Sequence, residues 1–338
     1  MENADSVGQT AINQLPTTTL AAGTWAFVTN RLAIKCELPF ELADGCVLDK
    51  ATPDQIDAIR KALAIPAGEK YAFPASMLWE WDYRQDPLNN QLTRTKLPKE
   101  EWMYYVVKTN DAGLSNLNLH FASSICEAPL DTGTLTFMIM ADGNTSTSVG
   151  PYKITNLFFG PIMNPALIVE RQQLEEISAV YGQFMSVTGG IGGEGKFPEI
   201  RRAIEMFDSL SSLPKFSDFN ILGLFAIIEM LITHNPKLED RGDSITHQMQ
   251  SKIPLLMRRF DRPVNYNQYF LTDNYKKIWG ALYKYRSAIA HGGQVVFEKD
   301  MQILKHSDCA REFVRDVVKA LLRHSLREPQ LYADLREC

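Results

Sequence analysis

Residues 283–293 hold two side chains whose types and spacing suit chemistry on a phosphate. They are Arg286 and His291, separated by four residues. A guanidinium presents a fixed fork of N–H donors that matches phosphate oxygens. An imidazole can accept and donate a proton near neutral pH. Together these two groups could cleave an RNA phosphodiester without a metal ion, so we interpret Arg286 and His291 as candidate catalytic residues.

A helix must position this pair. Its apolar residues recur with a period close to 3.6, at Ile278, Trp279, Leu282, Tyr285 and Ile289. Gly292 and Gly293 follow, and glycine readily adopts the left-handed conformation that ends a helix. The sequence therefore predicts a helix over 274–291, with Arg286 in its last turns and His291 at its end.

The form Arg-Ser-x-x-x-His-Gly over 286–292 resembles the signature of the HEPN superfamily, in the branch of bacterial ApeA-like proteins. The resemblance covers residues 217–328 and does not extend to the first half of the chain. It implies a helical bundle, RNA as the substrate, and metal-independent endoribonuclease activity. It also implies a homodimer in which two copies of the motif form one composite site. Family members of this kind act in prokaryotic antiphage defence or in toxin–antitoxin systems.

The resemblance also suggests roles for neighbouring residues. Family members often carry an acidic residue near the motif arginine, and Glu229 in the apolar helix 217–234 is the counterpart here. We expect an ion pair between Glu229 and Arg286, because a buried carboxylate needs a partner; the alternative is that Glu229 lies on an exposed edge of its helix. Ser287 and Tyr285 are expected to help position the catalytic pair.

A second interpretation is a non-catalytic module. Many HEPN domains only dimerise, and act as scaffolds or regulators. Many ribonucleolytic members carry Asn, Asp or His directly after the arginine, whereas this chain has Ser287. In that interpretation Arg286 forms a structural ion pair and His291 only caps the helix end.

The last long helix, predicted over 308–327, carries a row of basic residues spaced by four: Arg311, Arg315, Lys319 and Arg323. Such residues lie along one face of a helix. We expect this face to be exposed, either simply as a solvated surface or as a track for the RNA backbone.

Composition limits the class of protein. The chain has 338 residues with 45% hydrophobic and 22% charged content, which is typical of a globular protein. The net charge of −5 argues against broad, nonspecific binding to nucleic acid. The five cysteines form neither a disulfide framework nor a metal-binding pattern. We therefore expect a cytoplasmic protein without a membrane span, a metal or a cofactor.

The first half reads as β-rich. Segments rich in β-branched and aromatic residues predict strands at 102–108, 117–126, 134–140 and 152–159, after an extended stretch at 24–38 and a short helix at 51–63 that Thr52 caps. His120 falls in an alternating strand pattern and is expected to face solvent or pair within the sheet. Residues 1–20 are polar and expected to be mobile.

The second half reads as helical, with helices predicted at 165–187, 198–210, 217–234, 244–260, 274–291 and 308–327. The fold class is therefore α+β, with a mainly antiparallel β domain over 1–160 and a helical HEPN-like domain over 161–338 whose core is 217–328. From the architecture alone, we expect the β domain to be the sensor or regulator of the helical domain. Its partner would be a phage-derived trigger or an antitoxin.

A glycine-rich segment at 188–196 contains G-x-G-x-x-G and most of a P-loop. Both motifs bind nucleotides only when they follow a strand, and a P-loop must continue with Ser or Thr after Lys196, where this chain has Phe197. We interpret the segment as a flexible connector. A nucleotide site and a mobile loop over the active site are the alternatives.

Overall fold

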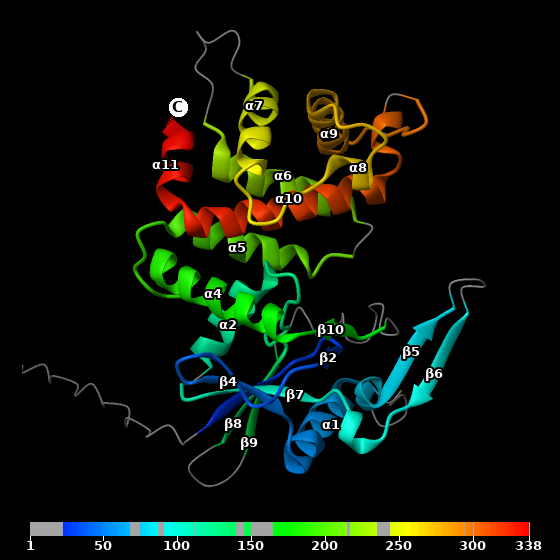
Figure 1. Ribbon diagram of the computed structural model, residues 1–338, viewed down its shortest axis with the longest axis vertical. Coiled ribbons are helices and arrows are strands. Elements are labelled where there is room, and N and C mark those ends of the chain that lie inside the picture. The colour runs from blue at the N-terminus through cyan, green and yellow to red at the C-terminus, as the bar shows by residue number, and fades with distance from the viewer. Residues whose placement is uncertain are drawn as a thin grey trace, which may run out of the picture.

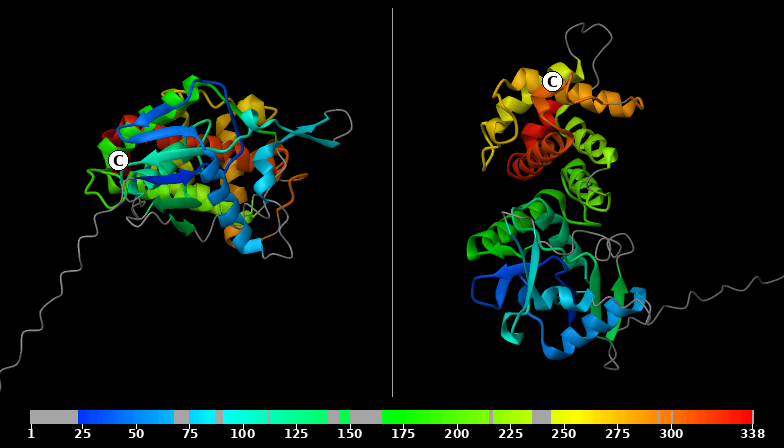
Figure 2. Two further views of the ribbon diagram at one scale, coloured as in Figure 1. Left: turned by 90° about the horizontal axis from the view of Figure 1, so that it is seen from below. Right: turned by 90° about the vertical axis from the view of Figure 1, so that its right-hand side faces the viewer.

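The computed structural model describes residues 23–67, 75–86, 91–111, 113–139, 145–149, 165–214, 217–234, 244–293, 295–299 and 301–337. The described chain is α+β, as the sequence predicts: most strands lie in its first half and most helices in its second. Figure 1 shows the two parts stacked along the long axis, with the sheet below and the helical part above. The side view in Figure 2 shows the same two layers.

An antiparallel six-stranded sheet forms the first part, in the order β3-β4-β7-β1-β8-β9. Its strands are β1 (Thr24–Phe27), β3 (Phe40–Ala43), β4 (Cys46–Lys50), β7 (Tyr105–Thr109), β8 (Leu135–Ile139) and β9 (Thr145–Val149). The strands predicted at 102–108 and 134–140 are confirmed as β7 and β8. The extended stretch holds β1 and the short strand β2 (Leu32–Ile34). The strand predicted at 152–159 lies outside the described residues.

Beside the sheet lies α1 (Pro53–Ala67), which confirms the predicted helix at 51–63. The Thr52 hydroxyl accepts from the Gln55 N–H at 3.3 Å, and the Gln55 side chain accepts from the Thr52 N–H at 3.0 Å. This reciprocal pair is a capping box and satisfies two N–H groups at the start of the helix. The remaining small elements are the 3₁₀ helices η1 (Ala75–Glu80) and η2 (Lys99–Glu101) and the hairpin of β5 (Trp81–Gln85) and β6 (Leu92–Lys96).

The strand predicted at 117–126 is wrong, because this segment forms the helix α2 (Leu114–Ser124). The Asp111 carboxylate accepts from the backbone N–H groups of Gly113 and Ser115, at 3.0 and 2.9 Å, and so caps the helix start. The polar residues in the alternating pattern do not face water: Asn116 and His120 are both buried. The alternation of polar and apolar residues therefore does not indicate a half-buried strand here, because the polar side chains are buried with partners in a helix.

The second part is built of helices, whose bounds are α4 (Arg171–Thr188), α5 (Pro198–Leu210), α6 (Asp218–Ile232), α7 (Ile245–Met257), α8 (Tyr266–Tyr269), α9 (Tyr275–Ala290), the 3₁₀ helix η3 (Gln302–Leu304), α10 (Ser307–Arg327) and α11 (Pro329–Glu337). The long helices confirm the predicted ones, with one correction at the start of 165–187. There β10 (Leu167–Val169) is a strand that pairs in parallel with β2. None of the helices in the described part is long and apolar enough to cross a membrane.

Helix α10 is the centre of the helical part and packs against α4, α5, α6, α7, α8 and α11. Helix α4 in turn packs against both α10 and the first part, through α2 and β3. The buried apolar residues accordingly form one continuous cluster that extends from Trp25 to Tyr332. The core does not stop at the domain boundary expected near residue 160.

Candidate functional site at the end of helix α9

Helix α9 presents the predicted motif. Asn274 caps its first turn, with the side-chain oxygen accepting from the Lys277 N–H at 3.2 Å. Its buried face consists of Ile278, Trp279, Leu282 and Tyr285, as the apolar period predicts. This face packs against α6 and α7. The helix is thereby fixed along its length, and its last turns carry Arg286 and His291.

Arg286 and Glu229 form the expected ion pair between α9 and α6. The Arg286 Nη2 atom lies 3.2 Å from Glu229 Oε1 and donates to Oε2 at 3.3 Å. The two side chains are 27% and 21% exposed, so Glu229 lies in the interface between the helices and not on an open edge. Burial raises the pKa of Glu229, and the positive charge of Arg286 offsets part of that effect.

The ion pair leaves donor capacity on the arginine. The buried Arg286 Nε has no hydrogen-bond partner in the part of the chain that the structure describes. The guanidinium carbon lies 5.8 Å from the centre of the Tyr283 ring, within cation–π range. Arg286 is therefore held by Glu229 and Tyr283 on one side and remains partly open to solvent. A guanidinium held in this way can bind an oxyanion without first losing much side-chain entropy.

His291 ends the helix in the predicted manner. It is the C-cap residue, its side chain is exposed, and Gly292 follows with a left-handed φ of 69°. The Gly292 N–H donates to the Ile289 carbonyl at 3.0 Å, and the Gly293 N–H donates to the Ala288 carbonyl at 2.8 Å. These two bonds form a Schellman motif. The imidazole is thus accessible and is carried by a backbone of fixed shape.

The two supporting residues lie differently. Tyr285 is 1% exposed and its ring packs edge-on against Phe297, with centroids 5.1 Å apart. Burial raises the pKa of Tyr285, and Arg311 opposes that effect. Tyr285 therefore belongs to the core next to α10. Ser287 is partly buried, and its carbonyl accepts from the His291 N–H at 3.1 Å, so its backbone helps to place the histidine.

The basic row on α10 is not exposed, which corrects the expectation of a solvated or RNA-binding face. Arg311 and Arg323 are 8% and 6% exposed, and Arg315 and Lys319 are partly buried. Arg311 is paired with Asp308, and Arg315 donates to the Asn220 side chain at 3.3 Å. An RNA backbone therefore has no access to the buried Arg311 and Arg323.

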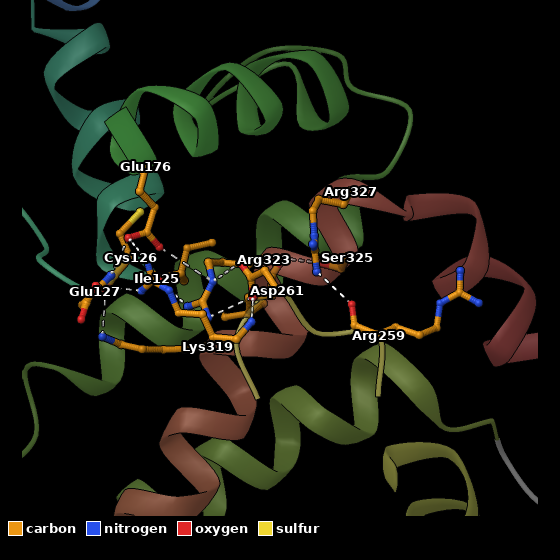
Figure 3. A network of polar contacts seen from close by, with 12 residues as sticks. Ile125, Cys126, Glu127, Glu176, Arg259, Asp261, Lys319, Arg323, Ser325 and Arg327 are labelled. Carbon is orange, nitrogen blue, oxygen red and sulfur yellow. Dashed lines mark hydrogen bonds and ion pairs between the residues drawn. The ribbon is translucent and has the colours of Figure 1, made fainter. Parts of the chain in front are cut away.

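Two of the four cations join the halves of the molecule instead. Arg323 donates to the Ile125 carbonyl at 2.7 Å, and Lys319 donates to the Cys126 carbonyl at 3.2 Å (Figure 3). These carbonyls directly follow the last turn of α2, and a positive charge is favourable at the C-terminal end of a helix. Arg323 also donates to both oxygens of Asp261, at 3.0 and 3.3 Å. The sequence period located the row correctly, but it could not show that another helix end covers it.

The glycine-rich segment connects α4 to α5 in a defined shape. Gly189 is the left-handed C-cap of α4, and the Arg201 guanidinium donates to the carbonyls of Gly190 and Gly193 at 2.8 and 2.7 Å. The Ile191 N–H donates to the Asn118 side chain at 2.7 Å. A phosphate-binding loop follows a strand and keeps its N–H groups free for the ligand. Here the loop follows a helix, which favours the structural connector.

His120 is buried in helix α2, whereas the sequence pattern predicted that it faces solvent or pairs within a sheet. It is 5% exposed, and its Nε2 lies 2.9 Å from Asp208 Oδ1 on α5. Its Nδ1 lies 3.7 Å from Asp131 Oδ1. His120 therefore connects the first part of the chain to α5. The sequence did not reveal this contact, because Asp208 is 88 residues away in the chain.

The arrangement within one chain brings Arg286 and His291 to the same helix end but not to the same face. Five residues correspond to about 140° of rotation around an ideal helix. In comparisons with protein-family models, with curated proteins and with solved structures, nothing matches this chain.

Proposed function

We propose that the helical part is a HEPN-type domain that cleaves RNA without a metal ion, with Arg286 and His291 as catalytic residues. The observation that carries the proposal is the ion pair between Glu229 and Arg286, together with an exposed His291 at the end of the same helix. The sequence motif predicted this pairing between two segments that are 57 residues apart. A fixed guanidinium and an accessible imidazole are what such a reaction requires.

In the proposed reaction, one imidazole of His291 accepts the proton of a ribose 2′-hydroxyl. The 2′-oxygen attacks the adjacent phosphorus, and the bond from phosphorus to the 5′-oxygen breaks. A protonated His291 imidazole gives its proton to the leaving 5′-oxygen. Arg286 stabilises the extra negative charge on the phosphoryl oxygens. The products are a 2′,3′-cyclic phosphate and a 5′-hydroxyl.

The site is proposed to be composite. Because Arg286 and His291 diverge by about 140° on one helix, two copies of α9 that meet around a twofold axis would supply both groups to one phosphate. The protein would then be a homodimer through its helical part. The first half would act as sensor or regulator, with a phage-derived trigger or an antitoxin as its partner, in keeping with antiphage defence or a toxin–antitoxin system.

A non-catalytic dimerisation module is the second candidate. It is favoured by the extent to which Arg286 is already engaged, by Glu229 and by the Tyr283 ring. Ser287 in place of Asn, Asp or His also fits this candidate. In that case α9 contributes an interface, and Arg286 and His291 contribute only structure.

RNA cleavage by the full chain in EDTA separates the two candidates. We expect wild-type protein to cut RNA and to leave cyclic phosphate ends, and His291→Ala to lower the rate by at least about 100-fold, the usual contribution of a general acid or base. His247→Ala, at the start of α7, is the matched control and should keep full activity.

The oligomeric state is measured on the same samples by light scattering. Folded dimers of both variants with activity lost only in His291→Ala would support the ribonuclease. A folded wild-type dimer that cuts no RNA in EDTA or with added metal ions would have two explanations: the helical part is a dimerisation module, or the first half holds the nuclease inactive until its partner binds.

A further inference from the structure

A cavity of about 380 Å³ lies where the end of α2 meets α8 and α10. Its wall includes Cys126 and Glu127 after α2, Arg262 before α8, Gln268 on α8, and Lys319 on α10. No residue of α9 lines it, so it is separate from the candidate site described above. Figure 3 shows the end of α2 above α10, with Lys319 and Glu127 on the same side of the network.

Most charges around the cavity are already paired. Arg262 contacts Glu127 at 3.1 Å and Glu176 at 2.9 Å. Arg323 uses its three nitrogens on Asp261 and on the Ile125 carbonyl. These pairs hold the wall together and neutralise the charges of the arginines, although Arg262 keeps N–H donors beyond its two ion pairs.

Lys319 differs from these arginines. Its Nζ donates to the Cys126 carbonyl at 3.2 Å, and no carboxylate among the described residues lies within ion-pair distance of it. Asp316, the nearby carboxylate on the same helix, accepts a hydrogen bond from the Tyr269 hydroxyl instead. An ammonium group has three donors, so Lys319 keeps two for a ligand in the cavity.

Burial and hydrogen-bonding capacity point to the chemistry of that ligand. Burial lowers the pKa of Lys319, and the negative charge of Asp316 offsets only part of the effect. A ligand that brings negative charge would stabilise the ammonium form. The Gln268 side chain has no hydrogen-bond partner among the described residues, and Arg262 keeps further N–H donors. Donors thus reach the cavity from three separate segments, which suits a tetrahedral oxyanion.

We propose that this cavity binds a small molecule through a phosphate group, which Lys319 contacts directly and Gln268 and Arg262 help to hold. The cavity volume leaves room for a small organic group beside the phosphate. This binding site does not depend on the proposed ribonuclease, because it shares no residue with Arg286, His291 or Glu229. Its position between the end of α2 and α10 means that the ligand would contact both halves of the molecule.

The test is a thermal unfolding titration of the full chain with inorganic phosphate, at constant ionic strength against NaCl. A ligand that binds only the folded state raises the midpoint in a saturable way. We expect this for wild-type protein and for Lys277→Met, which removes an exposed lysine at the start of α9. Lys319→Met should weaken phosphate binding by about tenfold or more, the effect of losing one charge-assisted contact.

Gln268→Glu is a second variant that does not disturb the core, because Gln268 is exposed. It places a negative charge at the cavity and should also weaken phosphate binding. If Lys319→Met does not fold, Gln268→Glu decides the question. No saturable effect of phosphate on the wild type, or the same affinity in both cavity variants as in Lys277→Met, would overturn the proposal.

Discussion

Glu229 illustrates how a single side chain can be both costly and useful. It lies on a helix that is otherwise strongly apolar, and its burial raises its pKa. Replacing a carboxylate there with an apolar residue would avoid the cost of desolvation. The structure shows what the carboxylate does instead: it holds the Arg286 guanidinium at a fixed place between α6 and α9.

Glu229→Gln tests this balance through pH. Because the folded-state pKa of Glu229 is above its ordinary value of 4.5, Glu229 contributes most to stability below that pH. The contribution is lost as pH rises through the raised folded-state pKa. Glutamine does not titrate. The free energy of unfolding of the variant should therefore increase relative to that of wild type as the pH rises from about 4 to about 8.

Urea unfolding of both proteins across that pH range measures the difference. Glu312→Gln removes an exposed carboxylate on α10 and serves as the reference variant. A difference between Glu229→Gln and wild type that stays constant, or falls as pH rises, would contradict the linkage. If the proposed ribonuclease activity is present, the same variant should also cleave RNA more slowly, because Glu229 holds Arg286 in position.

At the scale of elements, helix ends determine where the motif lies. The Schellman motif after α9 depends on the left-handed Gly292, around which an added Cβ would meet no atom within 4 Å. Substitution there is opposed only by the backbone conformation. A substitution of Gly292 therefore measures the free-energy cost of the left-handed backbone conformation without a change in side-chain packing.

Gly292→Ala should lower the free energy of unfolding by about 1 kcal/mol, the cost of a left-handed non-glycine residue. Gly182→Ala, inside α4 and also free of contacts at the Cβ position, should instead raise it by roughly 0.5–1 kcal/mol. Denaturant unfolding of wild type and of the two variants measures whether each substitution lowers or raises the free energy of unfolding. Equal effects at the two glycines would show that the end of α9 is not held in the left-handed form.

At the scale of the whole molecule, the two halves share one core and a set of polar contacts. The Arg323 side chain on α10 reaches the end of α2 and the loop after α7, and lies 4.0 Å from Glu176 on α4. Burial raises the pKa of Asp261, but the hydrogen bonds and charge of Arg323 lower it overall. The continuous apolar cluster predicts that the halves unfold together.

Arg323→Met should destabilise the whole chain by about 3 kcal/mol, because it removes the charged partner of Asp261 and the only donor to the Ile125 carbonyl among the described side-chain contacts. We place the loss at the low end of the usual range since the Asp261 side chain is 32% exposed. Calorimetry should show one transition for wild type and a lower midpoint for the variant. Arg171→Met, which removes an exposed pair on α4, should change little.

Two separate transitions in the wild-type protein would contradict the shared core. In that case the division expected at residue 160 would describe the molecule better than the continuous cluster does. An unchanged midpoint in Arg323→Met would show that the contacts to α2 contribute little.

The sequence by itself determined the features that depend on neighbouring residues. The apolar period and Gly292 predicted α9 and its end, and Thr52 predicted the start of α1. The strands β7 and β8 followed from their β-branched and aromatic content. The pairing of Glu229 with Arg286 was reached from the resemblance, because a lone carboxylate on an apolar helix requires a partner.

Only the tertiary structure decided what lies against each face. Basic residues spaced by four occur both on exposed helix faces and on faces that pack against the end of another helix. Arg323 was therefore expected to be exposed to solvent, but it is buried. The helix α2 was predicted as a strand, because the sequence of this segment does not show that its polar residues are buried. The partner of His120, Asp208, is far away in the sequence. Local sequence fixes the direction of a side chain, whereas burial depends on distant segments that the sequence pattern of one element does not contain.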